Sequence, residues 1–248
     1  MFVLPYIIAK ALAFHAAPYD NNGITKGVIM NVSVPPRLTY PEDEIRLPWL
    51  SLLLDAYAVV DKGVTIAVSR EKRKLRKRPA CTEGCYTCCR ANTDIPTYPL
   101  ELAGMTWYAM EKVLEPARSS LREQLSVGGN NPPCPFLVNS TCAVYPVRPI
   151  ACRQFIVFGK PCSAGDDPYY TRRGDVLTPI QDFTDQAMFI MLPFYGIIQD
   201  HERFRAIKNS FMHSKVQNIF SCSWTTLAEK MSSFDSFRRK DLQERLNV

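Results

Sequence analysis

The chain has 248 residues, of which 46% are hydrophobic and 22% are charged, and its formal net charge is +6. This composition excludes a disordered chain, and it also excludes a small scaffold that depends on disulfides for its stability. Much of the positive charge lies in the single run Arg70–Arg78, so the charge is a local feature of the chain.

Residues 1–47 show no sustained hydrophobic period, and Pro35, Pro36 and Pro41 interrupt them, which predicts an irregular N-terminal arm. The apolar start Met1–Ala9 is short for a secretory signal, and no basic residue precedes it, so we expect no secretion. No stretch reaches the roughly 20 apolar residues that a membrane span requires. We therefore expect a cytoplasmic protein, in a compartment where structural disulfides are rare.

From residue 48 onward, apolar residues recur every three or four positions, which is typical of helices with one buried face. In the first helix these residues are Leu50, Leu53, Tyr57, Val60, Val64 and Ala67. The first helix begins at Pro48 and ends before Pro79, and the second begins at Pro99. Leu114, Ala117, Leu121 and Leu125 continue the second helix across Pro116, which marks a kink or a restart.

A capping box formed by Thr178 and Gln181 predicts another helix with Pro179 in its first position. A last helix carries Trp224, Leu227 and Met231 on one face. We predict a mainly α fold, in which residues 48–248 form a single helical domain with irregular cysteine-bearing loops around a metal centre. The cysteine-cluster core of that domain is predicted at residues 80–165.

Cysteines provide the strongest functional signal, because eight of the nine lie between Cys81 and Cys162. The first group has the spacing C-x3-C-x2-C-C, and the second group is spread over a turn-rich segment without helical period. Such bunching is typical of metal sites or disulfide frameworks, and a reducing compartment favours metal. The predicted metal ligands are Cys81, Cys85, Cys88, Cys89, Cys134, Cys142, Cys152 and Cys162.

Sites made only of thiolates suit zinc or iron–sulfur clusters, of which a 4Fe-4S cluster is our first expectation. Adjacent Cys88 and Cys89 would point apart in extended backbone, so we expect them to serve different irons of one cluster or two separate sites. Four thiolates leave negative charge on either centre, and Arg90, Arg148 and Arg153 stand beside candidate ligands where they can offset it. The isolated Cys222 is interpreted as a buried thiol, and His15, His201 and His213 as non-ligands.

Three motifs occur in order, namely C-x3-C-x2-CC, CPFL and CxxYPxRPxxCR. Over residues 80–155 the chain resembles the YkgJ-like cysteine-cluster family, also described as the CxxxCxxCC zinc- or iron-chelating domain, which includes flagellin lysine N-methylases. The resemblance implies metal binding, and it implies an iron–sulfur cluster if the chain is like the methylase members. S-adenosylmethionine is a further cofactor that the methylase members suggest, but the chain has no Gly-rich strand-to-helix turn of the kind that binds it.

Three functions remain open from the sequence. The first is an iron–sulfur protein that is redox-active or modifies a protein substrate. The second is a zinc-stapled binding module without catalysis, whose basic run could meet phosphates, although we expect that run to be a solvated helix end and nucleic acid not to be a partner. The third is a thiol sensor or metal-handling protein, suggested by the vicinal Cys88 and Cys89. Whether the protein is an enzyme, and its oligomeric state, do not follow from the sequence.

Overall fold

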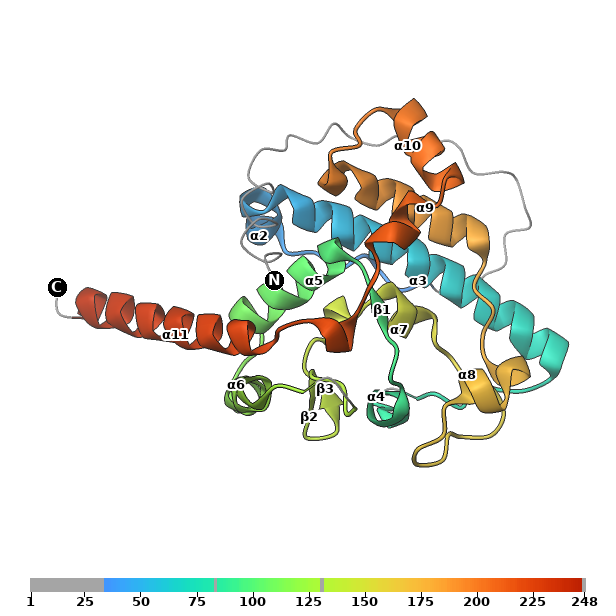
Figure 1. Ribbon diagram of the computed structural model, residues 1–248, viewed down its shortest axis with the longest axis horizontal. Helices are drawn as coiled ribbons and strands as arrows, with labels where there is room; N and C mark the ends of the chain where they lie inside the picture. Colours follow the sequence, from blue (N-terminus) through green and yellow to red (C-terminus); the bar gives the residue numbers. More distant parts are fainter. Residues whose placement is uncertain (1–33, 83, 130–131, 247–248) are drawn as a thin grey trace. The chain divides into compact units, whose positions relative to one another are not determined.

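The computed structural model describes residues 34–82, 84–129 and 132–246 (Figure 1). These residues form a mainly α-helical fold with small two-stranded sheets, which confirms the predicted class. They group into two compact units: the helical unit, which contains residues 34–77 and 177–214, and the cysteine unit, which contains residues 78–176 and 215–246. Within this part of the chain, no helix combines the length and the apolar character needed to cross a membrane.

The helical unit is built around one long helix, α3, which begins at Pro48 and ends at Leu75 as the apolar period predicts. Its predicted inner face is buried, except that Val64 is half-buried. Helix α9 packs along α3 (Figure 1). The remaining helices of this unit, with its 3-10 turns, are α2 (Pro41–Arg46), α9 (Gln181–Met191), η4 (Leu192–Tyr195), α10 (Asp200–Lys208) and most of η5 (Phe211–Lys215).

Gly63 allows α3 and α9 to approach closely. A Cβ atom on Gly63 would stand 2.6 Å from Cβ and 2.7 Å from Cγ of Phe183, so any larger residue would push the helices apart. Gly63 is also buried within α3. The reason for a glycine in mid-helix is therefore packing, which outweighs its low helix propensity.

The cysteine unit combines three helices with a long stretch of short elements. Helices α5 and α6 form on either side of Pro116, which confirms a restart at that proline, and α11 packs against both of them. Strands β1 and β4 pair antiparallel, and β2 and β3 form a hairpin in which Leu137 faces Cys142. The elements of this unit are α4 (Thr87–Ala91), β1 (Pro96–Thr97), α5 (Pro99–Glu111), α6 (Ala117–Val127), β2 (Leu137–Val138), β3 (Thr141–Cys142), η2 (Tyr145–Val147), α7 (Ile150–Gln154), α8 (Pro168–Thr171), η3 (Arg173–Asp175), β4 (Gln217–Asn218), η6 (Ile219–Ser221) and α11 (Thr225–Leu246).

Aromatic packing connects the C-terminal part of the chain to the second cysteine segment. The rings of Phe136 and Trp224 meet edge to face with centroids 4.7 Å apart, and both residues are buried. The indole N–H of Trp224 donates to the carbonyl oxygen of Ile219 at 2.8 Å, so its polar atom is satisfied inside the core. This contact anchors the loop that follows Cys134.

Three details differ from the sequence predictions. The predicted irregular arm contains the short helix α2 at residues 41–46, while residues 1–33 of that arm lie outside the described residues. The helix expected from the Thr178 capping box begins instead at Gln181, because Ile180 is still in extended conformation. Leu114 is 76% exposed, since it lies between α5 and α6 and not on a helical face.

Candidate metal centre

The first cysteine segment is held to the chain that follows α7 by backbone hydrogen bonds. The N–H of Ala80 donates to the carbonyl of Val157 at 2.7 Å, and the N–H of Gly159 donates to the carbonyl of Arg78 at 2.8 Å. In the same arrangement the N–H of Val157 donates to Sγ of Cys81 at 3.3 Å. An N–H donor directed at sulfur stabilises a thiolate.

Cys88 and Cys89 lie on helix α4, so the premise that they stand in extended backbone is wrong. The two thiols are hydrogen-bonded to each other, and this bond is the largest cause that raises the pKa of Cys88, followed by burial. Helical geometry separates adjacent side chains by about 100° and not by the 180° of a strand. Both sulfurs can therefore face the same centre, and the sequence argument that separated them fails.

The second cysteine segment meets the first at α4. The N–H of Cys134 donates to the carbonyl of Cys89 at 2.7 Å, which joins the two segments by their backbones. The hairpin β2–β3 then brings Cys142 back beside Leu137, and helix α7 carries Cys152.

Both of the first two thiols in this segment accept backbone hydrogen bonds. The N–H of Phe136 donates to Cys134, and the N–H of Val144 donates to Cys142, in each case from two residues further along the chain. Burial nevertheless raises the pKa of both thiols, that of Cys134 to about 12. Two consecutive loops thus direct an N–H at a cysteine sulfur.

Mutual electrostatic interactions show which thiols are neighbours. Burial, with smaller contributions from the thiols of Cys85, Cys88 and Cys162, raises the pKa of Cys81 to about 11. Burial also raises the pKa of Cys152, to which Cys134, Cys88, Cys142 and Glu101 add. Cys88 thus raises the pKa of both Cys81, in its own segment, and Cys152, in the second cysteine segment.

The predicted arginines have different surroundings. Arg148 lowers the pKa of the Cys142 thiol, which burial raises overall, and its guanidinium lies 3.9 Å from the ring centroid of Tyr145. The recorded contacts of Arg90 are with Ser140 and with the ring of Tyr86. Arg153 is buried and donates to the carbonyl oxygens of Pro146 and Arg148, so it fastens the turn before α7.

Arg172 is a charged neighbour of sulfur that the sequence analysis missed. Its guanidinium donates to Sγ of Cys162 at 3.6 Å and lowers the pKa of that thiol, which burial raises overall. Ion pairs with Asp166 and Asp175, each at 3.5 Å, hold the guanidinium in place. Ten residues separate Arg172 from Cys162 in a segment without regular period, so no sequence signal connects them.

Cys222 and the histidines were not predicted as ligands. Burial raises the pKa of Cys222 to about 11, and its thiol donates to the carbonyl oxygen of Asn218 at 3.9 Å. His201 and His213 belong to the helical unit, and His15 lies outside the described residues.

Thiol donors suit zinc or iron, and all nine cysteines are free and belong to the cysteine unit. The cysteine side chains do not form a closed metal site. Among residues 34–82, 84–129 and 132–246, no three His, Cys, Asp or Glu side chains lie close enough together to hold a metal ion. The raised pKa values belong to protonated thiols, and a metal binds thiolates. Coordination would therefore require these side chains to lose protons and turn toward a common point.

Comparison with known proteins identifies the same segment. Residues 80–172 match the model of the CxxCxxCC family, described as a "putative zinc- or iron-chelating domain". The matched range includes all eight predicted ligands and also Arg172. Searches of curated proteins and of solved structures found no match.

Proposed function

We propose that the CxxCxxCC domain of this chain binds zinc or iron through its eight cysteines, with an iron–sulfur cluster, 4Fe-4S in type, ahead of zinc. The observation that carries the proposal is the join between the two cysteine segments, where the N–H of Cys134 donates to the carbonyl of Cys89 at 2.7 Å. One structural zinc uses four ligands, so eight thiols exceed the needs of one such site. The donors suffice for one cluster with a neighbouring site, or for two four-thiolate sites.

Several groups could offset the negative charge of such a centre. Backbone N–H groups of Phe136, Val144 and Val157 point at sulfur atoms. Arg148 and Arg172 lower the pKa of neighbouring thiols by their positive charge. Donors of this kind tune the potential and stability of a metal–thiolate centre, which favours a role beyond simple packing.

A zinc-stapled module without catalysis is the second candidate, and the short elements of the second cysteine segment favour it. Between residues 134 and 176 no helix among the described elements exceeds the five residues of α7. Segments of this kind bury little apolar surface of their own, so metal binding would supply part of their folding free energy.

Anaerobic purification followed by elemental analysis and an absorption spectrum tests both candidates. Iron with acid-labile sulfide and broad absorption near 400 nm supports the cluster. A colourless protein with stoichiometric zinc supports the stapled module and contradicts the cluster. A protein that contains neither metal, and whose eight thiols all react without chelator, contradicts metal binding altogether.

A redox or protein-modifying activity, with a protein as substrate and the cytoplasm as its compartment, extends this proposal. Its support is the number of thiols and the reducing conditions they need. Reduction potentials of the purified protein, and assays for methyl transfer to protein lysines, test this extension separately from metal content. A redox-inactive zinc protein without methyl transfer would contradict it and leave metal binding intact.

A further inference from the structure

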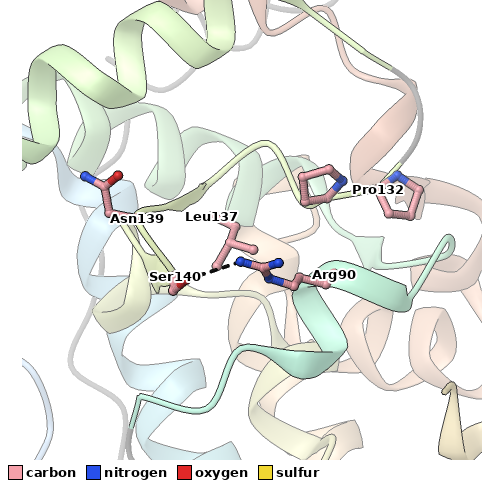
Figure 2. A pocket seen from close by; sticks show the side chains of 6 residues that line it. Arg90, Pro132, Leu137, Asn139 and Ser140 are labelled. Atoms are coloured by element: carbon pink, nitrogen blue, oxygen red, sulfur yellow. Dashed lines mark hydrogen bonds between the residues drawn. The ribbon is translucent and has the colours of Figure 1, made fainter. Parts of the chain in front are cut away.

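A cavity of about 390 Å³ opens beside α4 and the hairpin β2–β3 (Figure 2). It is lined by Arg90, Pro132, Pro133, Leu137, Asn139 and Ser140, all of which belong to the cysteine unit. Its volume is in the range of small-molecule sites, which are about 300–1,000 Å³. Both cysteine segments contribute to the wall. Arg90 follows Cys89 in the first, while in the second the prolines precede Cys134 and the hairpin ends at Cys142.

Arg90 gives this cavity its charge. It is the one charged side chain among the lining residues, and it is exposed. Its Nη2 donates to Oγ of Ser140 at 3.3 Å, and its guanidinium lies 5.0 Å from the ring centroid of Tyr86. In Figure 2 the guanidinium extends from α4 toward Ser140, with Leu137 beside it. A guanidinium has five N–H donors, so this single bond leaves most of them available to a ligand.

The hairpin turn that carries Ser140 is unusual in sequence. Asn139 and Ser140 have φ values of 49° and 62°, the left-handed conformation that a type I′ turn requires at both positions. Asparagine tolerates this conformation, but glycine is the residue preferred in the second position, so a serine there is strained. In return, Ser140 presents a hydroxyl to Arg90 that glycine could not provide.

We propose that this cavity binds a small ligand that has one carboxylate and an apolar body. The planar guanidinium of Arg90 matches the two oxygens of a carboxylate, and a single cation neutralises a single negative charge. A phosphate at neutral pH carries more charge, and the lining offers no second cation for it. Leu137 and the two prolines offer apolar contact to the rest of the ligand. This proposal rests on the cavity and does not depend on which metal the cysteines bind.

Isothermal titration calorimetry on the full chain tests the proposal. The probes are hexanoate for a free acid and N-acetyl-Ala-Leu for a peptide carboxyl terminus, with hexanamide and inorganic phosphate as comparisons. Binding of either carboxylate supports the site, and the tighter of the two identifies the source. Arg90→Gln should weaken that binding at least roughly tenfold, because a charge-assisted pair is lost. Arg70→Gln, which removes an exposed arginine of α3, should leave it unchanged.

Variants and wild-type protein are compared at equal metal content, so that loss of metal is not counted as loss of the cavity. If Arg90→Gln does not fold, Ser140→Ala serves as the second variant and should weaken binding by about threefold. The proposal is overturned if neither carboxylate binds, or if hexanamide or phosphate binds as tightly as hexanoate. It is also overturned if Arg90→Gln binds the carboxylate as well as wild-type protein does.

Discussion

Glu101 joins the α5 helix to the segment that carries Cys152, and its replacement by glutamine should destabilise the cysteine unit. Its carboxylate is fully buried. Oε2 accepts the N–H of Tyr98 at 2.9 Å, and Oε1 accepts the N–H of Ile150 at 2.7 Å. Ile150 is the first residue of α7, so the carboxylate holds the helix start two residues before Cys152.

The magnitude follows from the two hydrogen bonds. Glutamine keeps the shape of Glu101 but has one acceptor oxygen, so its NH₂ group would face one of the two buried N–H donors. Hydrogen bonds to a charged group contribute about 1.5–3 kcal/mol, and an unsatisfied buried donor costs about 1–3 kcal/mol. We therefore expect Glu101→Gln to lower the free energy of unfolding by about 2–4 kcal/mol. We also expect a chelator to remove metal faster, because the start of α7 is no longer held.

Urea denaturation followed by circular dichroism measures the first effect, and the rate of metal loss to a chelator measures the second. Glu123→Gln is the matched control, since Glu123 is an exposed carboxylate of α6 in the same unit. It should change stability by less than about 0.5 kcal/mol. If Glu101→Gln behaved like Glu123→Gln in both measurements, Glu101 would not anchor α7 and this argument would be refuted.

Three further predictions concern packing, charge and the loop before α7. Gly63→Ala should lower the free energy of unfolding by about 1–3 kcal/mol despite its better helix propensity, as measured by urea denaturation, because the new methyl group meets Cβ of Phe183. The hydrogen bond from Arg37 lowers the pKa of Glu44 below its ordinary value of 4.5, so the stability from this pair is present above pH 4.5 and is lost as the pH falls through the lowered pKa. Glu44→Gln should therefore lower the melting temperature at pH 7 and have little effect at low pH. Arg153→Lys should cost about 1–3 kcal/mol in urea denaturation, because one ammonium cannot reach both carbonyl oxygens that the buried guanidinium contacts.

Each of these predictions has a result that contradicts it. A Gly63→Ala protein more stable than wild type would mean that α3 and α9 separate without loss of packing. Phe183→Ala should not rescue Gly63→Ala, because the Cβ that clashes is still present. An equal effect of Glu44→Gln at pH 7 and at pH 3 would show that the carboxylate charge does not stabilise the fold. A wild-type unfolding curve for Arg153→Lys would show that the turn before α7 is held by other contacts.

The spacing of apolar residues was sufficient to predict the long helices but not the short ones. Helix α3 has many apolar residues at helical spacing, and its proline start and final basic residues mark its bounds. Helices α4 and α7 have five residues each, which is too short for a period to be visible. Helix α10 buries Ala206 among its nine residues, so it has almost no apolar stripe for a sequence analysis to detect.

The cysteine cluster was visible in the sequence, but the side chains around it were not predictable. Sulfur has a distinctive chemistry, and eight closely spaced cysteines signal a site in any fold. Arg172 and Ser140 have no such signature, because arginine and serine occur on every protein surface. A signal was available for Glu101, which stands three residues after Tyr98 at the start of a helix that opens with a proline.

The amino-acid sequence alone determined the mainly helical class, the first helix and the resemblance of the cysteine segment to a zinc- or iron-chelating domain, because periodicity and cysteine spacing are local properties of the chain. Only the tertiary structure decided that Cys134 bonds to Cys89, that Glu101 holds a helix 49 residues away and that Gly63 faces Phe183. Each of these contacts joins residues whose separation along the chain is unrelated to their distance in space. Packing brings them together, and no local pattern encodes which partner each residue will meet.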